Sequence, residues 1–169
     1  MKRACKHHIN DSGFTMIEMV MVLIVMAIVG TFIMSRVITS DNELLAQTEI
    51  LKSHLRHAQI KAMNETTVPC APWGIRIPDA GSYVLYRNNA VATDILPGEK
   101  PGASPAPQTH TLPATVTITG GVGTTYNFNV WGTPVDAGCN PIASAQTITL
   151  TQGTATSPIT ITRNTGYIP

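Results

Sequence analysis

The longest hydrophobic stretch of the chain lies near its N-terminus and carries almost no polar residue. Residues 14–34 read FTMIEMVMVLIVMAIVGTFIM, and Glu18 is the only charge among these 21 residues. A helix of that length spans about 30 Å, which matches the hydrocarbon core of a bilayer. The pattern therefore predicts a transmembrane helix over residues 14–34.

A second pattern, with helical spacing, covers residues 35–66. No glycine or proline interrupts it, and six residues recur at steps of three and four. Residues so spaced share one face of an amphipathic helix. We expect one continuous helix of about 50 residues from Phe14 to about Asn64, because proline disfavours helix in the residue before it and Val68-Pro69 comes next. The predicted buried stripe consists of Leu44, Thr48, Leu51, Leu55, Ala58 and Ala62.

Beyond this helix, hydrophobic residues occur at every second position. The alternation begins in WGIRIPDAGSYVLYRNN and returns in TVTITG, TTYNFNVWG, QTITLTQG and SPITITRNTG. Such segments are typical of antiparallel strands with one face toward the core. Residues 67–169 are therefore predicted to form a β-rich globular head, with the proline-rich segment 97–108 as an exposed loop. The predicted fold class is α+β, with a long N-terminal helix, transmembrane in its first half, packed on a small antiparallel two-sheet head.

Two details of the predicted strands can be tested. The strand that contains Tyr126 and Phe128 is expected to alternate on through Trp131. The last two strands are expected to pair across a Gly-Thr-Ala-Thr-Ser connection. The predicted partners there are Ile148 and Leu150 on one strand and Ile159 and Ile161 on the other.

Charge is distributed unevenly, although the net charge is only +1. Residues 1–13 carry Lys2, Arg3 and Lys6 against Asp11, whereas the rest of the chain has eight basic and nine acidic residues. By the positive-inside rule, a basic segment before an apolar one stays in the cytoplasm, and the chain beyond the apolar segment lies across the membrane. The small net charge gives no argument for nucleic acid or for an acidic partner.

The position of Glu18 has three competing interpretations. A cleaved secretory signal usually has a shorter apolar region and ends in small residues, which Ser35-Arg36-Val37-Ile38 does not provide. A plain membrane anchor fits the length but leaves the cost of a buried carboxylate unexplained. A cut between Gly13 and Phe14 would give Phe14 a free ammonium group, which is a natural counter-ion for Glu18 in the same or a neighbouring chain.

Gly13-Phe14-Thr15-Met16-Ile17-Glu18, between a basic leader and an apolar run, resembles the cleavage and methylation signal of type IV pilins and type II secretion pseudopilins. The resemblance implies that a prepilin peptidase removes residues 1–13 and methylates Phe14. Glu18 would then neutralise the amine of an adjacent subunit in a filament. The implied partners are other pilin or pseudopilin subunits, the peptidase, inner-membrane lipid and the membrane assembly platform, while a separate cytoplasmic ATPase supplies energy. The implied location is the inner membrane, with the N-terminus cytoplasmic and the head periplasmic, and later a pilus or pseudopilus.

Three further segments are similar to the GspH/FimT group of minor pilins and pseudopilins: LKSHLRHAQIKAMNETTVPCAPWGIRI, YNFNVWGTP and ITITRNTGYI. This similarity implies a minor subunit that primes or caps assembly. A major pilin is the alternative, as is a minor pilin whose head binds DNA or an exported protein. FimT-like proteins in some species bind DNA through basic residues near the C-terminus, where this chain offers only Arg163, so nucleic acid is not an expected partner.

The resemblance also divides the three cysteines. Cys5 would leave with the leader, and Cys70 and Cys139 would remain in an oxidising compartment. A disulfide between Cys70 and Cys139 would close about 70 residues and contribute about 4 kcal/mol in the chain-entropy model. Two separate thiols are the alternative.

No residues form a pattern typical of catalysis or of a cofactor site. The sequence lacks a G-x-x-x-x-G-K-[ST] loop, a CxxC motif and paired carboxylates, and His110 is the only histidine of the head. His54 and His57 have a spacing that could place two metal ligands on one helix face, but no third ligand is nearby, so we interpret them as surface histidines. We expect neither enzymatic activity nor a bound cofactor or metal.

A basic cluster on the predicted helix is likewise interpreted as part of the solvent-exposed surface and not as a binding site. Lys52, Arg56 and Lys61 could contact phosphate, but Glu49 and Glu65 flank them. Mixed charge of this kind is typical of a solvated helix face.

Overall fold

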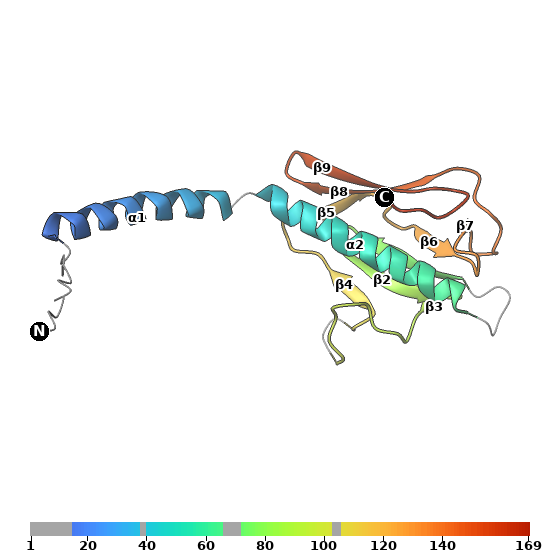
Figure 1. Cartoon of the computed structure of the whole chain (residues 1–169). Coiled ribbons are helices and arrows are strands. Elements are labelled where there is room, and N and C mark those ends of the chain that lie inside the picture. The colour runs from blue at the N-terminus through green and yellow to red at the C-terminus, as the bar shows by residue number, and fades with distance from the viewer. Residues whose placement is uncertain (1–14, 38–39, 66–71, 103–105) are drawn as a thin grey trace, which may run out of the picture. The chain divides into compact units, whose positions relative to one another are not determined.

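The computed structural model describes residues 15–37, 40–65, 72–102 and 106–169, and the side chains of 31–37 and 40–41 are not described. The chain divides into two compact units, Met1–Thr39 and Ser40–Pro169, which we consider separately. The first contains helix α1 (Met16–Val37), and the second contains helix α2 (Ser40–Met63) and nine strands (Figure 1).

The two helices replace the single continuous helix expected from the sequence. Val37, Ile38 and Thr39 are three successive β-branched residues, which lower helix propensity, and Ser40 is a residue type that favours a helix start. Residues 38–39 themselves lie outside the described residues. Among the residues that the structure describes, we find no helix that is both long and apolar enough to cross a membrane.

Helix α2 confirms the predicted stripe. All six stripe residues are buried, from Leu44 to Ala62. The hydroxyl of Thr48 donates to the carbonyl of Leu44 at 2.8 Å, so this buried polar group is satisfied within the helix. α2 lies against strands of both sheets (Figure 1).

The larger sheet is antiparallel and has the strand order β3-β2-β1-β6-β7. β4 also belongs to it and pairs with the first three residues of β2. The predicted alternation in the first hairpin is confirmed, since Trp73, Ile75 and Ile77 are buried. Asn88 and Asn89 both have positive φ, as the tight turn between β2 and β3 requires. The strands are β1 (Trp73–Asp79), β2 (Ser82–Arg87), β3 (Ala90–Val91), β4 (Thr109–Thr111), β6 (Thr125–Phe128) and β7 (Pro134–Val135).

The smaller sheet contains β5 (Thr117–Gly120), β8 (Gln146–Gln152) and β9 (Ala155–Ile161), in the order β5-β8-β9. Ile148 faces Ile159 as expected, but Leu150 faces Ser157. The expected five-residue connection is wrong, because pairing continues to Gln152 and Ala155 and leaves a two-residue turn. Gly153 has a φ of 59°, so glycine lets the chain reverse within two residues.

Both sheets are antiparallel, so the expectation of an antiparallel two-sheet head is confirmed. One core joins them to α2. Its largest fully buried side chains are Tyr83, Phe128, Leu51, Leu55, Ile75, Ile77, Leu85, Leu96, Ile118, Ile148, Leu150 and Ile159.

One expectation for the loops needs correction, and the expectation of an exposed proline-rich segment is confirmed for its described residues. β6 ends at Phe128 instead of continuing through Trp131, because the side chain of Asn129 accepts hydrogen bonds from the backbone amides of Trp131 and Thr133 and turns the chain. The proline-rich segment is exposed at Gly98, Lys100 and neighbouring residues, but Pro97 is held to α2 through its carbonyl group.

Candidate assembly helix and a buried polar cluster in the head

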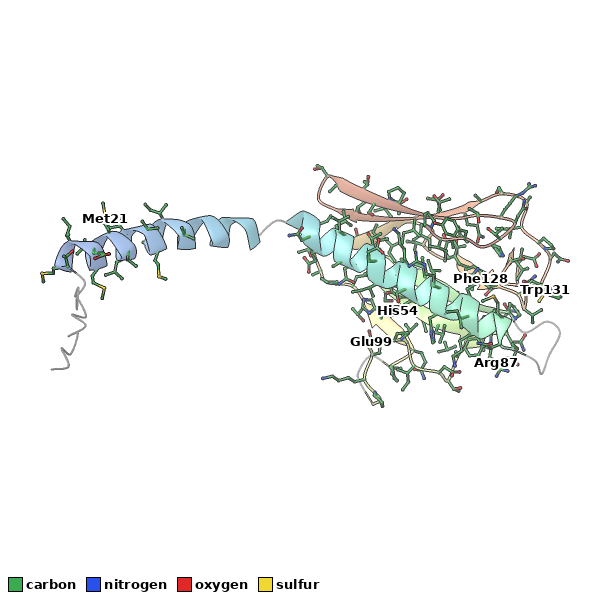
Figure 2. The ribbon with its side chains drawn as sticks, in the orientation of Figure 1. Met21, His54, Arg87, Glu99, Phe128 and Trp131 are labelled. Carbon is green, nitrogen blue, oxygen red and sulfur yellow. The ribbon has the colours of Figure 1, made fainter. Side chains whose placement is uncertain are left out.

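Helix α1 exposes apolar side chains around its whole circumference. Between Met16 and Val29, large hydrophobic side chains on every face are about half or more exposed, including Met21 (Figure 2). Gly30 has open space around it. A helix that is apolar on all sides does not stay in water alone, because burying each large side chain is worth about 1.5–3 kcal/mol. The described part of α1 is therefore an apolar surface whose burial would be favourable.

Glu18 lies in the first turn of α1 and is exposed. The carbonyl of Thr15 accepts from the amides of Glu18 and Met19, at 3.0 and 3.3 Å, which places Thr15 at the N-cap and Glu18 at the third helical position. Thr and Glu in these two positions form the capping-box pattern, and a carboxylate there also favours the helix dipole. Glu18 therefore has a local role in the helix start besides any role between subunits. Gly13 and Phe14, the expected cleavage and methylation residues, lie outside the described residues.

Cys139 is disulfide-bonded, which is the state expected for it. Cys70, the expected partner, lies outside the described residues. The loop around Cys139 is fixed by Asp136, whose side chain accepts from the amides of Gly138 and Asn140, each at 2.8 Å. These bonds, the Asn140 amide foremost, hold the pKa of Asp136 below its ordinary value. Cys139 itself has a φ of 64°, a backbone conformation that is uncommon for residues other than glycine.

His54 is buried, so its interpretation as a surface histidine is wrong. Its Nε2 lies 2.8 Å from the carbonyl oxygen of Pro97, and its Nδ1 lies 2.9 Å from the hydroxyl of Tyr83. A carbonyl only accepts, so Nε2 carries the proton and donates to Pro97. Nδ1 of the neutral ring then accepts from the Tyr83 hydroxyl. The position of His54 in the helix explains its burial, since it lies three residues after Leu51 and four before Ala58.

A second histidine, on β4, completes this buried cluster. His110 Nδ1 lies 2.7 Å from a carboxylate oxygen of Glu99, and its Nε2 lies 3.1 Å from the side-chain oxygen of Gln47. Each ring nitrogen of His110 therefore has one hydrogen-bond partner in the cluster. The His110 ring stacks on Tyr83 with 5.0 Å between centroids and meets His54 edge-on at 5.5 Å.

Burial dominates the electrostatics of this cluster. It lowers the pKa of His54, with the positive charge of His110 acting in the same direction, while the Pro97 carbonyl and Glu99 oppose the shift. Burial also raises the pKa of the Tyr83 hydroxyl above its ordinary value. The cluster therefore holds a neutral His54 and a neutral Tyr83 beside the partly buried contact between His110 and Glu99. We name Gln47, His54, Tyr83, Glu99 and His110 the histidine cluster.

The basic residues of α2 have partners on the same helix or elsewhere in the chain, so the face is more engaged than the solvated surface that was expected. Lys52 pairs with Glu49 at 2.9 Å, and Lys61 pairs with Asp94 at 2.7 Å. The guanidinium of Arg56 donates to a backbone carbonyl in the C-terminal segment. All three basic side chains thus already have a partner within the chain, which does not favour a role in phosphate binding. Among the described residues, no three potential metal-binding side chains come together.

The loop between β6 and β7 carries the most exposed aromatic side chain of the described head. Trp131 is 82% exposed (Figure 2), although its loop is fixed by Asn129 and by the amide of Gln59, which donates to the Gly132 carbonyl at 2.8 Å. Arg163, the one basic residue near the C-terminus, donates to a backbone carbonyl at 2.9 Å and to the neighbouring asparagine.

Sequence reasoning missed the histidine cluster, since its members come from four distant segments. The helical position of His54 was the one available signal. Comparisons with protein-family models, with curated proteins and with solved structures give no match for this chain.

Proposed function

We propose that this protein is a minor pilin or pseudopilin, processed by prepilin peptidase after Gly13 and methylated at Phe14. It then assembles through α1 into a type IV pilus or a type II secretion pseudopilus. Before assembly the chain is held in the inner membrane, with residues 1–13 in the cytoplasm and the head in the periplasm. The head, residues 67–169, primes or caps the filament and is packed on the buried stripe of α2.

The observation that carries the proposal is the exposed apolar surface of α1 with a single carboxylate in its first turn. An apolar helix of this kind gains stability when it packs among copies of itself. A carboxylate there is costly unless a positive charge accompanies it. The α-amino group created at Phe14 supplies that charge four residues away, in the same subunit or in the next. The disulfide at Cys139 agrees with a head outside the cytoplasm, since disulfides persist in oxidising compartments.

The first test is mass spectrometry of the N-terminal peptide, in membranes and in sheared surface filaments of the native host. A methylated peptide that begins at Phe14, present at a small fraction of the main subunit, is the expected result. The same peptide dominating the filaments would make the protein a major pilin. An intact leader in cells with active prepilin peptidase would exclude the pilin family altogether.

The second test separates the charge of Glu18 from its capping role. Glutamine serves at the third helical position as glutamate does, so Glu18→Gln keeps the helix start and removes the charge. We expect this variant to be cleaved but not incorporated into filaments. The matched control is Glu49→Gln, which removes an exposed carboxylate from α2 and should assemble normally. Normal incorporation of Glu18→Gln would contradict the assembly role.

A further inference from the structure

The histidine cluster fastens one segment of the head to α2. The Pro97 carbonyl accepts from His54, and the Glu99 carboxylate binds His110, so both ends of the short segment Pro97–Glu99 are held by imidazole rings. Leu96, just before it, is fully buried, and its amide donates to the carbonyl of Pro107 at 3.1 Å. The segment itself has no strand partner among the described residues. Figure 2 shows Glu99 close beside α2 at the position of His54.

From this geometry we propose that the histidine cluster is a pH-sensitive latch, which releases the segment Pro97–Glu99 from α2 when His54 takes up a proton. This inference does not depend on the proposed assembly function.

The reason lies in the hydrogen bond between His54 and Tyr83. A proton on Nδ1 removes the only acceptor that the described structure gives to the Tyr83 hydroxyl. Tyr83 is fully buried, so no solvent can replace that acceptor while the segment stays in place. A buried donor left without an acceptor loses its hydrogen bond to water without a replacement, which destabilises the closed arrangement.

Electrostatic repulsion also favours release of the segment when His54 is protonated. A protonated His54 lies 5.5 Å, ring centre to ring centre, from His110, and positive charge on His110 disfavours positive charge on His54. The Glu99 carboxylate offsets part of this repulsion, and His57 on the same helix adds to it when protonated. Tyr83, on β2, is neutral and compensates no charge. The net effect is that the closed cluster disfavours a second positive charge.

The segment moves because the other elements around the cluster are held more firmly. α2 is anchored by its six-residue stripe, and Tyr83 lies in the central part of the larger sheet, between β4 and β1. Lifting the segment Pro97–Glu99 breaks the two imidazole contacts and the hydrogen bonds of the Leu96 and Glu99 amides, and it exposes Leu96. It also gives water access to His54, which removes the desolvation cost of its charge.

The test is hydrogen exchange of the full-length protein in detergent, read by mass spectrometry on peptides covering Leu96 and Glu99, with rates corrected for the intrinsic effect of pH. Both amides donate in the closed state, to Pro107 and Leu96 respectively. Protection should fall about tenfold between pH 7 and pH 5. The ceiling for one histidine with an ordinary pKa of about 6.5 in the open state is about 30-fold.

Two matched variants assign the effect. His54→Gln is neutral at every pH and should abolish the pH dependence. His57→Gln removes a half-buried histidine from the same helix that does not contact the segment, and it should keep the dependence. Unchanged wild-type protection, or the same dependence in His54→Gln, would overturn the latch. Should His54→Gln fail to fold, the imidazole titration of wild-type His54 by NMR gives the second measurement. Proton uptake by His54 without loss of protection in the segment would also overturn it.

Discussion

The hydroxyl of Tyr83 donates to Nδ1 of His54 across 2.9 Å, and it joins the middle of the larger sheet to the buried face of α2. Both side chains are almost completely buried. The carbonyl of Pro97 fixes which nitrogen of His54 carries the proton, because a carbonyl only accepts and Nε2 must donate to it. The Tyr83 hydroxyl then donates to the unprotonated Nδ1 of the same ring.

Replacing Tyr83 with phenylalanine should therefore destabilise the head although it keeps the ring. The variant leaves Nδ1 of His54 buried without a donor, a change that costs about 1–3 kcal/mol of unfolding free energy. Urea denaturation at pH 7 measures it. Tyr167→Phe is the matched control, since Tyr167 is largely exposed and should change stability by less than about 0.5 kcal/mol. Equal stability of the two variants would show that the hydroxyl contributes nothing.

The stability of the head should decrease as pH falls below about 6.5. Burial lowers the folded-state pKa of His54 and of His57. Below about pH 6.5 the unfolded chain therefore binds more protons than the folded chain, which favours unfolding. The stabilisation is complete above pH 6.5 and is lost as pH falls toward the folded-state pKa values. Urea midpoints at pH 7, 6 and 5 measure the decrease, and His54→Gln should reduce its slope. A midpoint that rises on acidification would contradict the assigned direction.

The elements that could be predicted from sequence are those whose pattern is local. Thr48 and Ala58 lie on a repeated helical spacing, and Trp73, Ile75 and Ile77 alternate within five residues, so burial follows directly from periodicity. The two-residue turn after Gln152 was missed because Thr, Ala and Ser fit strand and loop equally well. Only the pairing register decides between the two.

The histidine cluster could not be predicted for a different physical reason. His54 and Glu99 are separated by more than forty residues, and β4, which carries His110, has only three residues. A strand that short has no detectable period, and its place is set by pairing with Ser82, Tyr83 and neighbouring residues. The sequence of α1 has the opposite property, since its apolar run and its capping pattern are both local in sequence.

A close backbone approach near the C-terminus should make one glycine irreplaceable. Gly166 has a φ of 63°, and a Cβ atom there would collide with the Gly132 carbonyl and with the amide of Gln59, which holds both loops. Gly153 has a similar φ of 59° but open space around it. Gly153→Ala should cost about 1 kcal/mol from backbone strain alone. Gly166→Ala should cost at least about 1 kcal/mol more in chemical denaturation, because the collision adds to the same strain. Equal losses in the two variants would show that the loops separate at no cost.

The disulfide at Cys139 should contribute strongly to the stability of the head. Cys139→Ser should lower the free energy of unfolding by about 2–5 kcal/mol, because the cross-link restricts the unfolded chain and closes a long loop if Cys70 is its partner. Peptide mapping under non-reducing conditions identifies that partner, and a peptide joining Cys70 to Cys139 is the expected product. Cys5→Ser is the matched control, since Cys5 belongs to the proposed leader and should leave stability unchanged. A linked peptide containing Cys5 would contradict both the pairing and the removal of the leader, because a leader cut away after Gly13 carries Cys5 with it.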